Sequence, residues 1–99
     1  MVLVLSQFKV ANGMSAEVKG AFMNRPHQVE NAPGFLRLDV VSPVDEPDEI
    51  WLLTYWHDLA SYEQWHQSPA HHQSHKGIPK GLRLDPAGTR VRVFNHISS

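Results

Sequence analysis

The chain has 99 residues and a formal net charge of −1, which is enough for a single domain, residues 1–99, with a modest core. Because the charge is near zero and no basic run occurs, we expect no nucleic-acid partner. The absence of cysteine excludes disulfides and thiolate metal sites. No stretch is long enough to span a membrane, and residues 1–5 lack the basic lead-in of an export signal, so we expect a cytoplasmic protein.

Residues 2–10 alternate in a way that predicts the first strand. One face carries Val2, Val4, Ser6, Phe8 and Val10, and the other carries Leu3, Leu5, Gln7 and Lys9. Asn12-Gly13 predicts a turn and Ser15 the N-cap of a helix. The apolar stripe of this helix contains Val18, Phe22, Arg25 and Val29. Pro26 predicts a kink or break, because it removes the hydrogen bond to the Phe22 carbonyl.

Three further strands follow from turn residues and alternation. Pro33-Gly34 turns the chain into a strand over residues 35–41, and residues 42–48 form a loop with two prolines and three acids. Residues 49–56 are apolar on both faces, which is typical of a strand buried on both sides. Residues 77–88 are irregular, and residues 89–97 form the last strand.

The stretch from Trp56 to His75 holds two of the three tryptophans and five of the seven histidines. Asp58 is a predicted N-cap, and Leu59, Tyr62 and either Trp65 or His66 recur at helical spacing. Ser68-Pro69 predicts the start of a second short helix, which Gly77 ends. On that helix His71 and His75 are four residues apart, and His72 and His75 are three apart, so each pair shares a face. The two helices therefore bring a large aromatic side chain close to imidazole.

The predicted order of elements is β-α-β-β-α-β, an α+β arrangement of the ferredoxin-like type. Both helices then cover one face of a four-stranded sheet, and 99 residues leave nothing to cover the other. That second face carries Leu3, Leu5, Trp51 and Leu53, an apolar patch that soluble monomers rarely expose. We therefore expect a two-fold homodimer through the sheet faces.

The residues of the 56–75 stretch have plainer interpretations as well. Trp65 is also consistent with an ordinary core aromatic of a short helix. The histidines of the second helix are consistent with a solvated face, or with a weak transition-metal site through the His71/His75 pair. Spacing alone leaves these alternatives open.

The stretch, together with Asn31-Ala32-Pro33-Gly34-Phe35 upstream, resembles the antibiotic-biosynthesis monooxygenase-like family of small dimeric α+β proteins. It is most similar to the branch of haem-degrading monooxygenases. The shared pattern is a helix, P-G-F and two strands, of which the second ends in tryptophan. A further tryptophan, the pair S-P and a histidine then follow. Trp65 and His75 occupy the positions of this tryptophan and this histidine. The resemblance implies a dimeric α/β barrel, formed by two sheets that pack face to face.

The resemblance also implies roles for individual residues. His75 matches the histidine that binds haem iron, and Trp65 matches the tryptophan that presses against the macrocycle and directs oxygen onto it. Phe22 is implied as part of an apolar wall, with Phe8, Val29 and Phe35, and Arg25 or His27 as a partner for the propionates. The haem-degrading branch carries an asparagine in the first strand as distal hydrogen-bond donor. This chain has Ser6-Gln7 there, so these two residues are the candidates for that catalytic role.

Three functions follow from these features. The first is a haem-binding monooxygenase, with or without degradation of the haem, with molecular oxygen as co-substrate and an electron donor as a further partner. The second is a cofactor-free monooxygenase of a quinol or polyphenol, for which His, Trp, Tyr62 and Ser6 supply a base and donors. The third is a non-enzymatic dimer that binds a small molecule. Haemin binding separates the first from the others.

Overall fold

The computed structural model describes residues 1–25, 28–74 and 78–99, and only the backbone of residues 72–74. Its main elements are β1 (Val2–Lys9), α1 (Ser15–Met23), β2 (Phe35–Val41), β3 (Glu49–Trp56), α2 (Leu59–His66), α3 (Pro69–Ser74) and β4 (Arg90–Asn95). Two short 3₁₀ turns, η1 (Val29–Asn31) and η3 (Pro86–Gly88), lie between them. None of the helices within these described ranges has the length and apolar character needed to cross a membrane.

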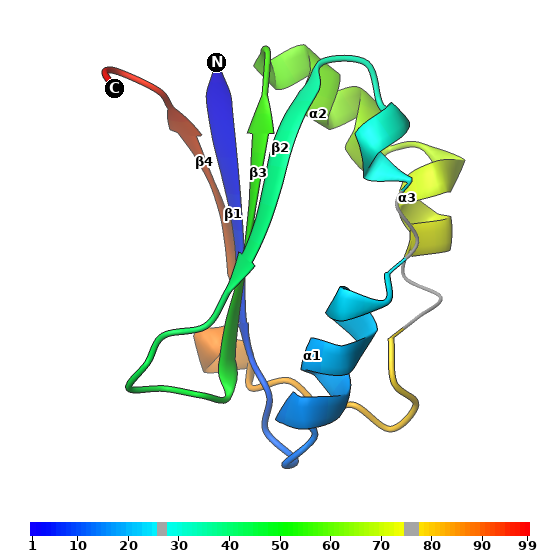
Figure 1. Ribbon diagram of the computed structural model, residues 1–99, viewed down its shortest axis with the longest axis vertical. Helices are drawn as coiled ribbons and strands as arrows, with labels where there is room; N and C mark the ends of the chain where they lie inside the picture. The colour runs from blue at the N-terminus through cyan, green and yellow to red at the C-terminus, as the bar shows by residue number, and fades with distance from the viewer. Residues whose placement is uncertain (26–27, 75–77) are drawn as a thin grey trace.

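The strands form one antiparallel sheet in the order β2-β3-β1-β4. This confirms the predicted α+β, ferredoxin-like arrangement. Helices α1, α2 and α3 all lie on one side of the sheet, and both chain ends lie at the same end of it (Figure 1). We call the covered side of the sheet the helix face and the other side the outer face.

Alternation along the strands decides which side chains meet the helices. Val4 of β1 pairs with Thr54 of β3, and Thr54 pairs with Leu38 of β2, so these three side chains share the helix face. Two buried clusters form beneath the helices. The first contains Val2, Val4, Val29 and Trp56, and the second contains Val10, Val18 and Ile50.

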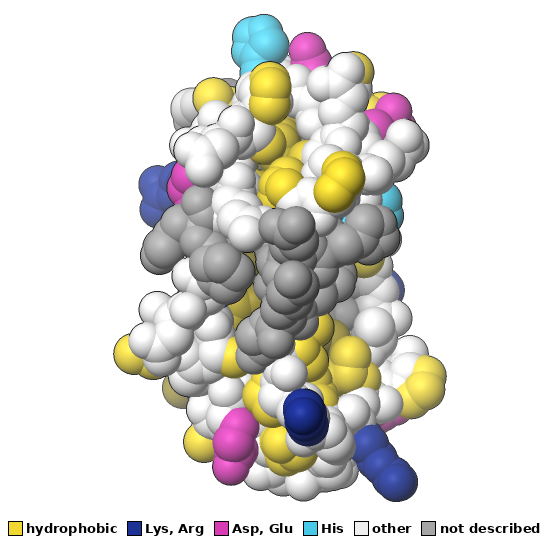
Figure 2. Space-filling model, turned by 90° about the vertical axis from the view of Figure 1, so that its right-hand side faces the viewer, with side chains coloured by type: hydrophobic (Ala, Val, Ile, Leu, Met, Phe, Trp, Pro, Cys, Tyr) yellow, Lys and Arg dark blue, Asp and Glu magenta, His cyan; other side chains and the backbone are white. Residues whose placement is uncertain are grey.

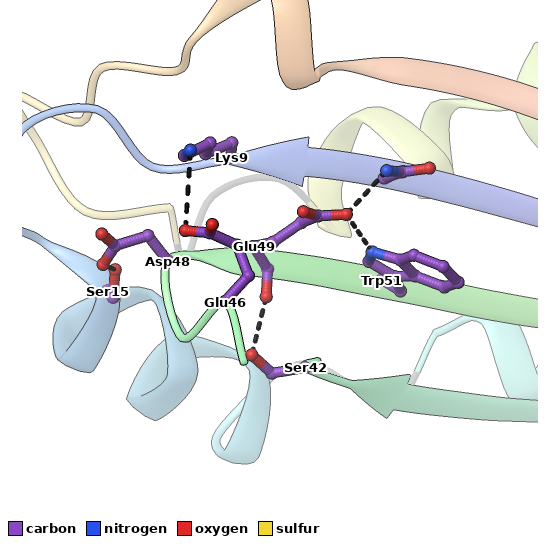
Figure 3. A network of polar contacts seen from close by, with 8 residues as sticks. Lys9, Ser15, Ser42, Glu46, Asp48, Glu49 and Trp51 are labelled. Carbon is purple, nitrogen blue, oxygen red and sulfur yellow. Dashed lines mark hydrogen bonds and ion pairs between the residues drawn. The ribbon is translucent and has the colours of Figure 1, made fainter. Parts of the chain in front are cut away.

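The first helix differs from its prediction at both ends. Ser15 is the first residue of α1 rather than its cap, and its hydroxyl donates a hydrogen bond to Asp48 Oδ1 at 2.5 Å, which ties the helix to the loop before β3 (Figure 3). The residue at the N-cap position, Met14, makes no side-chain cap. α1 ends at Met23, and Val29, predicted on the same helix, is buried in η1. Pro26 lies outside the described residues.

The outer face combines apolar side chains with a polar network. Trp51 Nε1 donates to Glu49 Oε1 at 2.5 Å (Figure 3), and Gln7 Nε2 donates to the same oxygen at 2.6 Å. Leu53 pairs with Leu5, and Leu5 pairs with Arg92, so these three also belong to the outer face. This face therefore carries the apolar residues that the sequence predicts there.

Candidate functional site

A cavity of about 300 Å³ lies between the helix face of the sheet and the helices. Its sheet side is formed by Val4, Ser6, Phe8, Leu38, Leu52 and Thr54. Its helix side includes Phe22, Arg25, Val29, Tyr62, Trp65 and His71. From the helix side of the molecule, hydrophobic side chains are visible at the surface above and below the undescribed residues (Figure 2). The cavity is thus mostly apolar, with a few polar groups that converge on it, as is usual for small-molecule sites.

Capping residues set the positions of Trp65 and His71. The Asp58 carboxylate accepts from the Ser61 backbone N–H at 2.8 Å and from its hydroxyl at 2.7 Å, which confirms the predicted N-cap of α2. These hydrogen bonds, that of the Ser61 hydroxyl above all, hold the pKa of Asp58 below its ordinary value. α2 therefore begins at Leu59 and presents Tyr62 and Trp65 to the buried cluster of Val2, Val4, Val29 and Trp56.

Ser68 joins the two short helices. Its hydroxyl donates to the Trp65 carbonyl at 2.7 Å and accepts from the His71 backbone N–H at 3.2 Å. One side chain thus satisfies the last turn of α2 and the first turn of α3, as predicted for an N-cap. The rings of Trp65 and His71 meet edge to face, with centroids 5.7 Å apart. The exposed ring of His66 lies 4.9 Å from that of His71.

Trp56 holds the sheet side of the cavity in place through its packing and one hydrogen bond. This side chain is fully buried, with 0% exposed, and packs edge-on against Phe35 and Tyr62. Its indole Nε1 donates to Thr54 Oγ1 at 2.8 Å, and Thr54 is only 8% exposed. A buried indole N–H needs such an acceptor. The bond therefore fixes the rotamer of a hydroxyl-bearing side chain that lines the cavity.

Arg25 brings a positive charge to the cavity wall. Its Nη2 lies 2.5 Å from Glu30 Oε1, and its side chain is 19% exposed. A guanidinium has five donor hydrogens, so this ion pair leaves donors for a second anion. Phe22 lines the cavity beside Arg25 and packs against Phe8, with ring centroids 5.9 Å apart.

Tyr62 adds a phenol to the helix side of the cavity. Burial raises the pKa of Tyr62 above its ordinary value, and the nearby Glu63 carboxylate adds to the effect. The phenol is therefore neutral at physiological pH and can act as a hydrogen-bond donor. None of the described residues forms a hydrogen bond with its hydroxyl.

The predicted site residues divide into three groups. Ser6, Phe22, Arg25 and Trp65 all line the cavity. Gln7 lies on the outer face, hydrogen-bonded to Glu49, because neighbouring strand residues point to opposite sides of the sheet. His75 and His27 lie outside the described residues. Within the described part of the chain, no three histidine or carboxylate side chains form a group that could hold a metal ion.

Two cavity residues were not singled out for this position from the sequence. The sequence pattern predicts Thr54 only as part of a strand that is apolar on both faces, and His71 only as a surface or metal-pairing histidine. The alternation that places Trp56 on the helix face also places Thr54 there. For His71, the Ser68 N-cap was the available signal, since it fixes where α3 begins.

A four-stranded antiparallel sheet with helices on one face and a mostly apolar cavity between them defines a small α+β domain of the ferredoxin-like type. The chain belongs to the antibiotic biosynthesis monooxygenase family, whose family model matches residues 1–77.

Two relatives of this chain have names that refer to heme. A "Heme oxygenase (mycobilin-producing)" of Mycobacterium tuberculosis is 30% identical over 80 residues, which cover 79% of this chain and 76% of the relative. A "Heme-degrading monooxygenase" of Bacillus thuringiensis subsp. konkukian is 33% identical over 85 residues, which cover 80% of this chain and 78% of the relative.

Solved structures agree on the fold. The heme-degrader MhuD from Mycobacterium tuberculosis, solved with two hemes bound in its active site, is 25% identical and gives a TM-score of 0.80, with 100% of this chain and 98% of that chain covered. SnoaB, a cofactor-independent oxygenase from Streptomyces nogalater, gives a TM-score of 0.77 at 17% identity, with 99% of this chain and 94% of that chain covered. The second likeness concerns the fold alone.

Proposed function

We propose that this protein is a monooxygenase that binds haem in the cavity between sheet and helices and degrades it with molecular oxygen. The observation that carries the proposal is the cavity itself, where the rings of Trp65 and His71 meet beside mostly apolar walls. The names of its relatives, a heme oxygenase and a heme-degrading monooxygenase, point to the same ligand.

The residues present fit haem in three respects. Phe8, Phe22 and Leu52 offer apolar surface to a flat macrocycle. Arg25 offers cationic donors to a propionate, since Arg binds carboxylates through paired N–H groups. α3 offers imidazole, and a single imidazole would be sufficient because the porphyrin itself supplies four nitrogen ligands to the iron.

The axial ligand is proposed to be His75, on the match of the W, S-P and H pattern. His71 of α3 is the second candidate, because its ring lines the cavity. Trp65 is proposed to press against the macrocycle, and Ser6 to contribute a distal hydroxyl. Bound haem would supply the reaction with dioxygen, with electrons from an external donor, while the chain's own side chains orient the ligand and exclude water.

A second copy of the chain is proposed to cover the outer face. Apolar side chains of β1 and β3 support this, and so does the layout of charge across the sheet. Glu49 lies on β3, whereas Arg90 and Arg92 lie on the edge strand β4 and pair with Gln7 and Leu5 of the outer face. A two-fold packing of two such faces can bring arginines of one copy toward the carboxylates of the other.

One observation favours a second candidate function, the cofactor-free oxygenation of a quinol or polyphenol. Tyr62, His71 and Ser6 give the cavity a phenol donor, an imidazole and a hydroxyl of its own. These groups are sufficient to bind and deprotonate an electron-rich phenolic substrate without a metal.

Haemin titration into the pure protein separates the two. We expect a Soret band that saturates at one haem per subunit. His75→Ala should abolish or shift the band, whereas His66→Ala should leave it unchanged because that ring is exposed. If the Soret band shifts in His71→Ala but not in His75→Ala, then His71 is the iron ligand. With ascorbate and oxygen, decay of the band supports degradation. A wild-type protein that takes up no haemin sinks the haem proposal and favours the cofactor-free reaction.

A further inference from the structure

Two hydroxyls stand out on the sheet side of the cavity. Ser6 of β1 and Thr54 of β3 line it among aliphatic and aromatic neighbours such as Val4 and Leu52. Ser6 pairs with Leu52 and Val4 pairs with Thr54, so Ser6 and Thr54 are diagonal neighbours on the same face. Such neighbours have Cβ atoms within roughly 7–8 Å of each other. One small ligand atom can therefore contact both hydroxyls.

The hydrogen bond from Trp56 leaves the Thr54 hydroxyl with a hydrogen to donate. Thr54 Oγ1 accepts a hydrogen bond from Trp56 Nε1, which lies 2.8 Å away, and this bond occupies one of its acceptor positions. A hydroxyl has one donor hydrogen in addition to its acceptor positions. No described residue accepts that hydrogen, and none within the described ranges hydrogen-bonds the Ser6 hydroxyl. The hydrogen bond from the Trp56 indole therefore uses only one of the three hydrogen-bonding positions of the Thr54 hydroxyl.

The two walls of the cavity carry different chemistry. Imidazole and indole rings come from α2 and α3, on the helix side, whereas both hydroxyls come from the sheet. Figure 1 shows α2 and α3 on one side of the sheet to which β1 and β3 belong. A flat ligand between the walls would therefore meet imidazole on one face and hydroxyl donors on the opposite face.

We propose that the hydroxyls of Ser6 and Thr54 form a two-donor polar subsite that holds one acceptor atom on the sheet side of the cavity. In the ligand-free protein this atom is the oxygen of a water molecule. When haem is bound, it belongs to a small ligand on the face of the macrocycle opposite the imidazole, a part of the inference that rests on the proposed function. Trp56 is a positioning residue in this subsite, because it acts through Thr54.

The test has a ligand-free arm that does not depend on haem. A high-resolution crystal structure of the wild-type protein should contain an ordered water within hydrogen-bond distance of Ser6 Oγ and Thr54 Oγ1. Ser6→Ala and Thr54→Val should each lose it, and Thr54→Ser should retain it. A Thr54 hydroxyl that donates to a backbone carbonyl, with no water beside it, overturns the proposal whether or not the protein binds haem.

The second arm uses haemin-loaded protein and two probes, azide with the ferric form and carbon monoxide with the ferrous form. Loss of one donor in Ser6→Ala or Thr54→Val should weaken azide binding by about 3- to 10-fold. It should also raise the C–O stretching frequency, because a donor near the ligand oxygen favours electron donation into the C–O antibond. Thr54→Ser should restore both values.

Two controls make the second arm specific. Thr89→Val makes the same change at a hydroxyl outside the cavity, which donates to the Asp85 carbonyl, and should alter neither probe. Ser6→Ala leaves the Trp56 bond intact, so it remains informative if Thr54→Val folds poorly. The haem-bound part of the proposal is overturned if azide affinity and C–O frequency are unchanged in Ser6→Ala and in Thr54→Val. The Thr54→Val protein must be folded and fully loaded with haem for this comparison. If the wild-type protein binds no haemin, both the haem-bound part of the proposal and the proposed function are overturned. The ligand-free part is then tested by the presence or absence of the ordered water.

Discussion

The imidazole of His71 meets the indole of Trp65 edge to face, with ring centroids 5.7 Å apart and planes 75° apart. The two residues belong to different helices, and the hydrogen bonds of Ser68 to both segments hold them in this relation. Edge-to-face contacts between such rings add about 0.5–1.5 kcal/mol to their packing. The Trp65 ring is therefore fixed at the cavity wall before any ligand enters.

A first prediction concerns Trp65. Trp65→Phe should keep haem bound but slow its degradation, because a smaller ring fills the position without pressing on the macrocycle. Trp65→Ala should also weaken haem binding, by about two- to tenfold, because it removes the aromatic contact with His71. Haemin titration gives the affinity, and decay of the Soret band with ascorbate gives the rate. Equal decay rates in Trp65→Phe and wild type would remove Trp65 from the catalytic proposal.

A second prediction tests the dimer. Leu53→Arg places a charge in the middle of the outer face and should convert the dimer to a folded monomer, because an unpaired charge in an apolar interface is costly. Sedimentation at micromolar concentration measures the mass, and circular dichroism checks the fold. Val44→Arg is the matched control, since Val44 is fully exposed in the loop before β3. A wild-type protein that sediments as a stable monomer contradicts the prediction outright.

The sequence predicted most of the fold because its signals are local. The bounds of β2 and β3, residues 35–41 and 49–56, agree with the prediction, since turn residues and alternation mark both strands. The start of α1 was one residue out. Ser15 has the residue type of an N-cap, but its hydroxyl donates to Asp48, which is 33 positions away in the sequence. Rules that use only neighbouring residues do not predict such a contact.

The site was predicted less completely, since residues distant in sequence form it. Ser6, Phe22, Arg25 and Trp65 line the cavity, and the roles that the resemblance implies for them stay predictions. The side of the strand on which Gln7 lies depends on register, and a shift of one residue exchanges the two faces. The bond between Trp56 and Thr54 depends on rotamers that the sequence pattern does not encode.

A third prediction follows from the lowered pKa of Asp58. A carboxylate whose pKa is lower in the folded state stabilises that state above its unfolded pKa, and the contribution disappears as the pH falls through the folded pKa. Asp58→Ala should therefore lower the free energy of unfolding at pH 7, and the difference from wild type should shrink below about pH 4. Urea unfolding at several pH values measures it. Asp45→Ala, in the exposed loop before β3, is the control and should leave the free energy of unfolding at pH 7 nearly unchanged.

The last prediction concerns Gly34, in the turn before β2. Its φ is +82°, and a Cβ atom at this position would lie 2.2 Å from Ser61 Oγ and 2.5 Å from Ser61 Cβ. Gly34→Ala should therefore carry both a backbone cost of about 1–2 kcal/mol and a steric cost. Gly13 is a matched control, because its φ is +76° and no atom lies within 4 Å of the corresponding Cβ. Gly13→Ala should show the backbone cost alone.

Urea unfolding of the two variants should rank Gly34→Ala as the less stable. A double-mutant cycle with Ser61→Gly isolates the steric part, because that change removes the atoms that the new methyl group would meet. Gly34→Ala should then cost less in the Ser61→Gly background, with a coupling energy of about 0.5–3 kcal/mol. If the two glycine variants are equally stable, or the cycle shows no coupling, then the turn can move away from Ser61 and the close approach does not restrict residue 34 to glycine.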